Sequence, residues 1–270
     1  MAGLSTSPWR AGRLCLVAVG AAFWIAPAAN AEGWESVEVY SGFDFSSGSY
    51  GETVSTDILY IPLTVKYETG PWTLRGTTSY VHVRGPANVI GTGDNTAFIG
   101  NAGAVGSFSR SGVGDLLLGV TYSLESFWKR SLYVDLTAKV KLPTASARKA
   151  LGTGKTDFIL QADIAKALGR FTPFGTIAYR FIGRPSAYRL HNAWNASAGL
   201  QYRLARGFDI GASYDYRQSA LPGGVDPKEV FTYVAFGLGK EWSLDVYGVA
   251  GLSSGSADAA GGIQISFRPR

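Results

Sequence analysis

Apolar and polar positions alternate with a period of two along most of the chain. The stretch 115–124, which reads DLLLGVTYSL, places Leu116, Leu118 and Val120 on one parity and mainly small or polar residues on the other. The stretches 131–142 and 194–204 repeat this pattern, and their charged residues lie on the face opposite the leucines. A period of two is that of a β-strand, so the pattern predicts strands with one apolar and one polar face.

The same pattern predicts twelve strands in all. Several of them run to about 10 residues, which is longer than the 5 to 6 of a typical soluble strand and close to the 9 to 11 that cross a bilayer when tilted. The predicted strands are 35–43, 57–67, 72–84, 113–124, 131–142, 156–167, 172–183, 194–204, 208–218, 229–239, 242–251 and 260–268.

The connections between these strands alternate in length. Short ones fall at 68–71, 125–130, 169–171, 205–207 and 239–241, and longer ones rich in glycine, serine and proline fall at 44–56, 85–112, 143–155, 184–193, 219–228 and 252–259. Aromatic residues such as Trp72 and Trp194 lie where strands meet connections, as in the interfacial girdles of membrane barrels. We therefore predict an all-β fold, a transmembrane antiparallel up-and-down β-barrel of about 12 strands. The alternative is a soluble β-sandwich, which would bury its apolar faces in a core and use shorter strands.

The N-terminus has the features of a secretory signal peptide. Arg10 and Arg13 precede an apolar run at 14–26, and the run 29–31 (ANA) matches an A-x-A cleavage site. The apolar run is too short for a helical span, which argues against a membrane anchor. We predict residues 1–31 as the signal peptide and residues 32–270 as a barrel in the outer membrane of a bacterium. The one cysteine, Cys15, would leave with the signal, so the mature chain could form no disulfide and no thiolate metal site.

The composition agrees with an exported membrane protein that does not bind nucleic acid. Only 17% of the residues are charged, whereas about 25% is usual, and 35 are glycine. The formal charge of +5 falls to +3 once the two arginines of the signal are removed. This excess is too small to predict a nucleic-acid partner. We expect outer-membrane lipid to surround the barrel. The sequence does not indicate the oligomeric state.

One stretch resembles a nucleotide-binding loop. Residues 150–158, ALGTGKTDF, end in Gly-Lys-Thr, but the first glycine of a Gly-x4-Gly-Lys-Thr motif would fall at Lys149. The residues after Thr156 alternate as a strand, so no helix N-terminus is available to hold a phosphate. We predict no nucleotide and no other cofactor.

The two histidines, His82 and His191, are the remaining candidates for chemistry. Neither lies in a hydrolase motif, and two histidines without a spaced carboxylate partner make a poor metal site. We therefore predict that the protein is not an enzyme and holds no metal. An outer-membrane hydrolase that uses one of these histidines stays as an alternative.

The polar face of the strands carries charges of both signs. If the leucine-rich parity faces lipid, a set of charged residues faces the lumen, where they either bridge a narrow barrel and make it rigid or line a water-filled path and filter solutes. Twelve strands lie between the barrels that side chains fill and the open porins. The loop 85–112, with Val89, Ile90, Phe98, Ile99, Val105 and Phe108, either folds into the mouth or stays on the surface. The pore-lining candidates are Lys66, Arg75, Asp115, Asp135, Lys139, Lys141, Asp163, Arg180, Arg203, Asp215, Arg217 and Asp245.

Several stretches carry a resemblance to a known family. YIPLTVKYETGPW, SGVGDLLLGVTYSL, KVKLPTASARKALGTGKTDFILQADIAKALGR, HNAWNASAGLQYRL, SYDYRQ and YGVAGLSSGSADAAGGIQISF resemble a bacterial family of outer-membrane transporters named after the meta-cleavage pathway of phenol degradation. The resemblance covers nearly the whole mature chain, and its most specific parts are K-x-P-T and L-G-T-G-K-T-D. It implies a β-barrel and the passage of aromatic or other small organic compounds. The chain departs from the family in ending FRPR rather than at an aromatic residue.

Together these observations predict an outer-membrane channel for the passive passage of small organic solutes, aromatic ones among them. The alternative from another class is a structural or surface-interaction barrel whose lumen is closed by bridges between charged residues and whose loops carry the function.

Overall fold

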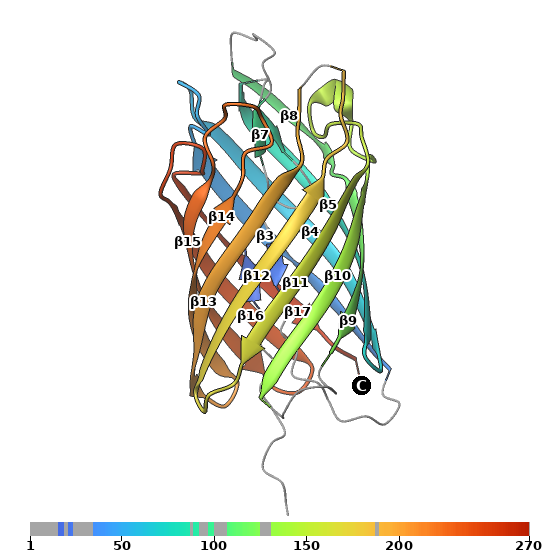
Figure 1. Cartoon of the computed structure of the whole chain (residues 1–270), viewed down its shortest axis with the longest axis vertical. Coiled ribbons are helices and arrows are strands. Elements are labelled where there is room, and N and C mark those ends of the chain that lie inside the picture. Colours follow the sequence, from blue (N-terminus) through green and yellow to red (C-terminus); the bar gives the residue numbers. More distant parts are fainter. Residues whose placement is uncertain are drawn as a thin grey trace, which may run out of the picture.

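Twelve spans of β-strand close into one antiparallel barrel in the computed structural model (Figure 1). The structure describes residues 16–18, 21–23, 35–86, 89–91, 97–99, 107–124, 131–186 and 189–269. Each barrel strand pairs with its neighbours in sequence, and the last strand pairs with the first. The predicted barrel of about 12 strands is therefore confirmed. The predicted signal peptide lies outside the described residues, apart from β1 (Leu16–Ala18) and β2 (Ala21–Phe23), which pair with each other.

The strands agree closely with the periodic segments of the sequence. β8 and β9 together form one span of the wall, because β5 pairs with both of them along its length. The barrel strands are β3 (Ser36–Gly48), β4 (Thr56–Thr69), β5 (Trp72–Pro86), β8 (Ser107–Val113), β9 (Leu116–Ser123), β10 (Leu132–Leu142), β11 (Asp157–Lys166), β12 (Phe171–Phe181), β13 (Ala193–Ala205), β14 (Phe208–Arg217), β15 (Lys228–Leu238), β16 (Trp242–Gly251) and β17 (Ala259–Phe267).

Two small elements lie in the long connections. β6 (Val89–Gly91) and β7 (Ala97–Ile99) pair with each other between β5 and β8, and η2 (Ala147–Lys149) is a short 3-10 helix between β10 and β11. No helix of the described residues is long and apolar enough to cross a membrane.

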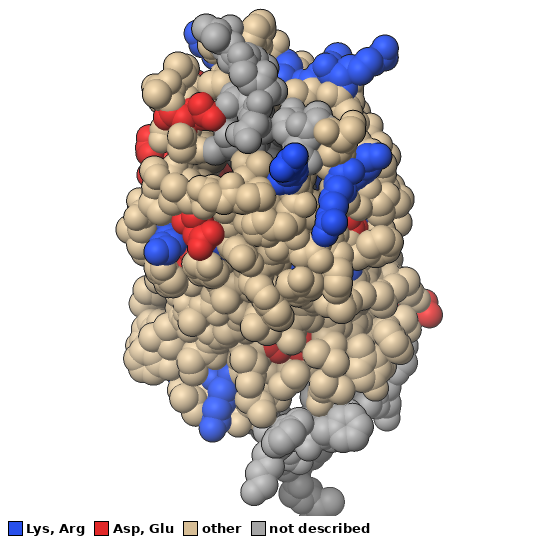
Figure 2. All heavy atoms as spheres, turned by 45° about the horizontal axis from the view of Figure 1, so that its top comes forward, with Lys and Arg blue, Asp and Glu red and all other residues tan. Residues whose placement is uncertain are grey.

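The apolar face of the sheet points outward. In β11, Phe158, Leu160 and Ile164 are each more than half exposed, whereas Asp157 and Asp163 on the opposite face of the strand are buried. This arrangement inverts that of a soluble protein, so the β-sandwich alternative is wrong. Figure 2 shows few charged side chains on the wall and a gathering of Lys and Arg toward the long-loop end. An apolar outer wall on a closed barrel is that of a bacterial outer-membrane protein.

Aromatic rings pack against one another on the wall at both ends of the barrel. Near the short turns, Trp72 contacts Tyr122 with ring centroids 4.7 Å apart, and Trp242 contacts Phe267 at 4.5 Å. At the long-loop end, the rings of Tyr179 and Trp194 are 4.6 Å apart. These pairs match the two interfacial girdles of membrane barrels.

The short turns and the chain ends mark the periplasmic side. The turn between β13 and β14 needs Gly207 at φ 74°, and the turn between β15 and β16 needs Gly239 at φ 81°, a region that other residues rarely adopt. β3 begins and β17 ends at this same end of the barrel (Figure 1). Short periplasmic turns and long extracellular loops are usual in such barrels.

Two stretches of the wall were predicted as loop. β3 continues to Gly48 instead of ending at residue 43, and β8 adds six residues of strand, 107–112, inside the predicted loop 85–112. Both stretches are rich in serine and glycine, which weakens the apolar alternation. These extensions raise the wall on the extracellular side.

Candidate functional site

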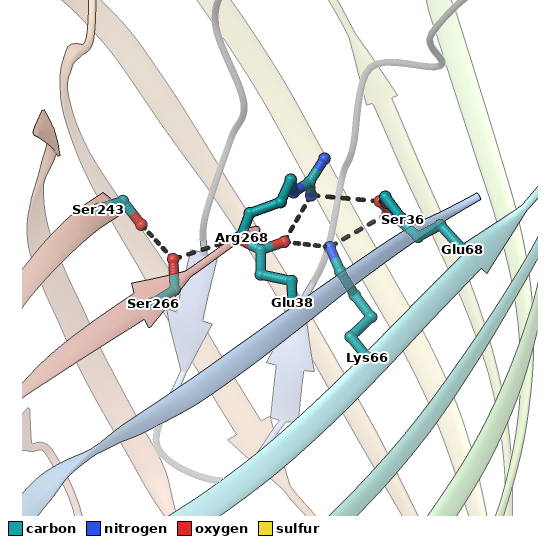
Figure 3. A network of polar contacts seen from close by, with 7 residues as sticks. All are labelled: Ser36, Glu38, Lys66, Glu68, Ser243, Ser266 and Arg268. Carbon is teal, nitrogen blue, oxygen red and sulfur yellow. Dashed lines mark hydrogen bonds and ion pairs between the residues drawn. The ribbon is translucent and has the colours of Figure 1, made fainter. Parts of the chain in front are cut away.

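The barrel interior is the candidate functional site, because the polar face of every strand points into it. Its periplasmic end holds a network of seven polar side chains, which we call the periplasmic network: Ser36, Glu38, Lys66, Glu68, Ser243, Ser266 and Arg268 (Figure 3). Lys66 Nζ lies 2.9 Å from Glu38 Oε2 and 3.1 Å from Glu68 Oε1. Arg268 binds the same two carboxylates at 2.5 and 3.2 Å.

The periplasmic network joins the first and last strands of the barrel. Glu38 lies on β3, Lys66 and Glu68 lie on β4, and Arg268 follows β17. Ser266 Oγ donates to Glu38 Oε1 at 3.1 Å and also contacts the Ser243 hydroxyl on β16 at 2.6 Å. Two cations balance two carboxylates, so these buried charges are compensated. Arg268 follows β17, and the sequence analysis did not predict this role for it.

A second ion-pair network lies near the extracellular mouth. Lys141 Nζ lies 2.8 Å from Asp157 Oδ2 and 3.3 Å from Asp115 Oδ2, and all three side chains are at most 3% exposed. Lys141 is the second-last residue of β10, Asp157 starts β11 and Asp115 lies between β8 and β9. Asp115 also accepts a hydrogen bond from Ala145 N at 2.9 Å. These contacts fix the loop 143–155 to three strands of the wall.

The two motifs most specific to the resembled family build this loop. In K-x-P-T, Lys141 supplies the buried cation, and Thr144 Oγ1 accepts from Leu116 N at 2.8 Å and donates to Gly114 O at 2.9 Å. In L-G-T-G-K-T-D, Leu151 is 1% exposed and Asp157 completes the ion pair. The stretch that resembles a nucleotide-binding loop therefore contributes to the structure of the mouth.

The loop packs its apolar side chains into the barrel mouth. Leu151 belongs to a buried cluster drawn from several loops and strands, which we call the mouth cluster: Tyr50, Ile58, Tyr60, Val81, Val83, Ala145, Leu151 and Ala257. Tyr50 lies in the loop after β3 and donates its hydroxyl to Ser46 Oγ at 2.9 Å. Burial raises the pKa of Tyr50 to about 12, so its hydroxyl stays protonated. The mouth is thus narrowed by packed side chains.

The loop 85–112, predicted to fold into the mouth or to stay on the surface, is described only in part. Phe108 lies on β8 and is half exposed. Val105 and the side chains of Val89, Ile90, Phe98 and Ile99 lie outside the described residues. From the β10–β11 connection, Ala145 and Leu151 belong to the mouth cluster.

Five aromatic side chains face inward between the two networks, and we call them the lumen belt: Tyr133, Phe174, Phe231, Tyr233 and Tyr247. The ring centroid of Phe231 lies 5.9 Å from that of Tyr233 and 5.5 Å from that of Tyr247. The belt spans β10, β12, β15 and β16. An inward aromatic surface is unusual for a lumen, because barrel interiors are mainly polar.

Inward glycines on neighbouring strands make room for the lumen belt. A Cβ atom at Gly199 would collide with the ring of Phe174, and one at Gly211 would collide with the ring of Tyr233. Gly199 and Gly211 lie on β13 and β14, next to the strands that carry these rings. The rings therefore lie along the wall of the lumen.

Carboxylates flank the lumen belt on β3, β14, β15 and β16. Asp44 accepts a hydrogen bond from the Tyr247 hydroxyl at 2.6 Å, and Asp215 accepts one from Ser213 Oγ at 3.2 Å. Glu229 pairs with Arg217 at 2.5 Å. This region of the lumen therefore combines aromatic faces with carboxylates.

All twelve sequence-predicted candidates lie on the inward parity of the barrel, but few of them contact one another. Lys141 joins Asp115 directly. Lys139 Nζ donates to Gln161 Oε1 at 2.7 Å, and the amide nitrogen of Gln161 donates to Asp163. Three candidates pair with carboxylates outside the set: Lys66, Arg203 and Arg217. The remaining five lie on separate positions of β5, β10, β12, β14 and β16: Arg75, Asp135, Arg180, Asp215 and Asp245.

The sequence analysis missed two groups of interior residues. Glu38 and Arg268 were missed because their contact depends on barrel closure. Phe231 and Tyr233 were not predicted as interior residues, although both share the inward parity with Glu229. The inward Gly211 opposite Tyr233 was the available signal for a ring lying on the wall.

The histidines make few contacts that suggest catalysis. His82 Nε2 lies 3.4 Å from Ser109 Oγ on the exposed wall, and His191 Nδ1 lies 2.8 Å from Asn192 O. Among the described residues, no group of three or more His, Cys, Asp or Glu side chains could hold a metal ion.

Comparison with known proteins gives a family and a fold. The family model described as "Putative MetA-pathway of phenol degradation" matches residues 35–268. No curated protein matches the chain significantly. The COG4313 outer membrane channel from Pseudomonas putida F1 is 15% identical, with a TM-score of 0.62 over 90% of this chain and 98% of that one. At this identity the likeness concerns the fold.

Two further solved structures are similar at a lower level. The toluene transporter TodX of Pseudomonas putida is 12% identical with a TM-score of 0.45, over 86% of this chain and 89% of that one. The translocator domain of autotransporter NalP from Neisseria meningitidis is 11% identical with a TM-score of 0.49, over 90% of this chain and 91% of that one. Both scores are too low to carry an argument about this chain.

Proposed function

Because the chain belongs to the family described for the MetA pathway of phenol degradation, we propose that it is a passive outer-membrane channel for small organic solutes, aromatic ones among them. It acts as a channel rather than as an enzyme, and outer-membrane lipid surrounds its apolar wall. The fold that it shares with the COG4313 outer membrane channel supports this proposal.

The observation that carries the proposal is the lumen belt. Phe174, Phe231 and Tyr233 are buried, whereas Tyr133 and Tyr247 are only partly buried and offer apolar contact to a solute inside an otherwise polar interior. Small-molecule sites combine apolar and aromatic surface with a few polar groups, and the belt with its flanking carboxylates has that composition. An aromatic solute gains contact with these rings on its way through.

The twelve charged candidates of the inward parity are proposed as pore-lining residues. Charged side chains of both signs keep the lumen hydrated, which disfavours the passage of fully apolar solutes. Their arrangement along the lumen also selects solutes by charge. Lys139 and Asp163, joined through Gln161, illustrate how opposite charges share one region of the wall. The belt then selects among the solutes that enter.

We also propose that residues 1–31 are removed on export. Mass spectrometry of the protein extracted from outer membranes should give a mature N-terminus at Glu32. A chain that retains residues 1–31 in that membrane would contradict the cleavage.

Planar-bilayer recordings test the channel directly. The refolded protein is first checked for barrel formation by heat-modifiable migration on gels, and currents are then recorded across a bilayer. Discrete conductance steps are expected. A folded barrel that gives no conductance and no solute flux would refute the channel.

The second candidate is a structural or surface-interaction barrel with a closed lumen. The observation that favours it is the pair of buried ion networks, which hold the interior at both ends, together with the packed mouth cluster. It predicts a folded barrel that is silent in the same recordings, so one experiment separates the two functions.

A further inference from the structure

One part of the lumen wall holds more carboxylates than cations. Apart from Glu38, which belongs to the periplasmic network, the inward charged residues on β3 and on β13 to β17 are five acids and two bases: Asp44, Asp209, Asp215, Glu229, Asp245, Arg203 and Arg217. The whole chain carries a net charge of +5, so this local excess of acid runs against the overall balance. A negative wall attracts cations into the lumen.

The two bases pair with two of the five acids. Arg203 Nε lies 3.2 Å from Asp209 Oδ1, and an amino nitrogen of Arg217 lies 2.5 Å from Glu229 Oε1. The other three carboxylates form no ion pair with a described residue. Asp44 and Asp215 accept hydrogen bonds from neutral hydroxyls, those of Tyr247 and Ser213. Arg217, two residues from Asp215 on the same face of β14, is already paired with Glu229.

Asp245 differs from Asp44 and Asp215 in lacking even a neutral donor. Its side chain is almost fully buried, and its Oδ1 accepts no hydrogen bond from any described residue. A buried carboxylate without a partner is costly, and this cost is relieved by a cation that binds to it. Asp245 is therefore a position where a bound cation would compensate a buried carboxylate.

The position of Asp245 places it at the edge of the lumen belt. Tyr247 is the next inward residue on β16, and Tyr233 lies directly across from Tyr247 on β15. The cross-strand neighbours of Asp245 are Ala235, which is small, and Gln264, which is uncharged. A cation at Asp245 therefore lies within reach of aromatic faces, and no described base on the flanking strands opposes it.

We propose that Asp245 and the lumen belt form a subsite for small organic cations that carry an aromatic or apolar body. The inference rests on the proposed channel and names a solute class for it. The ammonium group of the solute lies against Asp245, and its apolar body packs on Tyr247, which is only partly buried. The attraction between a cation and an aromatic face adds to the ion pair, and organic anions are excluded by the unpaired carboxylates.

Calorimetric titration of the folded full-length barrel in detergent tests the subsite without requiring conduction. Benzyltrimethylammonium is the probe, tetramethylammonium lacks its ring, and benzenesulfonate reverses its charge. We expect benzyltrimethylammonium to bind, tetramethylammonium to bind about fivefold or more weakly, and benzenesulfonate not to bind. Low ionic strength keeps the charge interactions unscreened.

Two substitutions with the same change of charge isolate the role of Asp245. Asp245→Asn should weaken benzyltrimethylammonium binding about tenfold or more, whereas Asp258→Asn, at an exposed carboxylate in an extracellular loop, should change it less than about twofold. Tyr247→Leu should weaken binding of the aromatic probe but leave that of tetramethylammonium unchanged. Heat-modifiable migration confirms that each variant is folded.

The outcomes separate this inference from the channel itself. Equal binding by the wild type and Asp245→Asn, or equal binding of the cationic and anionic probes, would overturn the subsite. Binding that depends on Asp245 in a barrel that gives no current would uphold the subsite and refute the channel. Currents from a barrel that does not bind benzyltrimethylammonium would uphold the channel and refute the subsite.

Discussion

Replacing Lys141 with methionine should release the loop 143–155 from the barrel mouth. The substitution keeps most of the side-chain volume but removes the cation that lies 2.8 Å from Asp157 and 3.3 Å from Asp115. At an effective dielectric constant of about 20, each of these contacts has a gross Coulomb energy of about 5–6 kcal/mol. Desolvation offsets part of this, and removal of one partner from a buried ion pair typically costs about 3–5 kcal/mol.

Limited trypsin digestion in proteoliposomes measures this loss where it occurs. Arg148 and Lys149 are exposed trypsin sites within the loop, and hydrogen bonds from Lys149 N and Leu151 N to Ser146 O hold its backbone in place. If cleavage requires local opening, a loss of about 3 kcal/mol should speed it about 100-fold.

Lys155→Met is the matched control for this experiment, because Lys155 is an exposed lysine of the same loop. Cleavage at Arg148 and Lys149 should stay at the wild-type rate in this variant. If Lys141→Met were cleaved no faster than Lys155→Met, the buried ion pair would not be what holds the loop.

Three further changes test the wall and the interior. Arg268→Ala leaves two buried glutamates with one cation and should lower the free energy of unfolding by about 3 kcal/mol, which denaturant titration in lipid vesicles measures; Arg268→Lys should recover part of it. Leu160→Arg, in the middle of β11, should cost about 2–4 kcal/mol in the same assay, whereas Leu168→Arg, equally exposed but at a turn, should cost little. Gly211→Ala places a Cβ against a belt ring and should reduce the yield of folded barrel on heat-modifiable gels, whereas Gly119→Ala, with only ordinary contacts, should not.

The strands could be predicted from the sequence because lipid imposes a uniform requirement on the wall. Every outward position inside the bilayer must be apolar, so the alternation persists along each span. The predicted strand 131–142 and the observed β10, Leu132–Leu142, differ by one residue. The parity also placed the charged candidates on the inner face, because a side chain such as that of Lys139 cannot face lipid.

The upper wall could not be predicted in the same way. In β8 the stretch Ser107–Val113 reads SFSRSGV, in which polar residues occupy both parities. A wall that rises above the bilayer contacts water on its outer face, so nothing there enforces alternation. Its pairing with β5 is decided by the tertiary structure alone.

The interior contacts depend on closure of the barrel. Arg268 and Glu38 are 230 residues apart in sequence and become neighbours only when β17 pairs with β3. The ion pairs that hold the loop 143–155 likewise join Lys141 to Asp157 and Asp115, which no spacing in the sequence relates. The stretches K-x-P-T and L-G-T-G-K-T-D lie at the two ends of this loop, and their Lys141 and Asp157 form the buried ion pair.

Cysteine accessibility under voltage tests most directly whether solutes pass through the lumen. The only cysteine, Cys15, lies in the predicted signal peptide, so single cysteines can be introduced without a background signal. Ser197 lies on the inward parity of β13, and its neighbour Ala196 lies on the outward, exposed parity. A charged, water-soluble thiol reagent should reduce the single-channel current of Ser197→Cys and leave that of Ala196→Cys unchanged. Currents that the reagent does not alter at Ser197→Cys, although the cysteine is present and the barrel is folded, would contradict passage through the lumen.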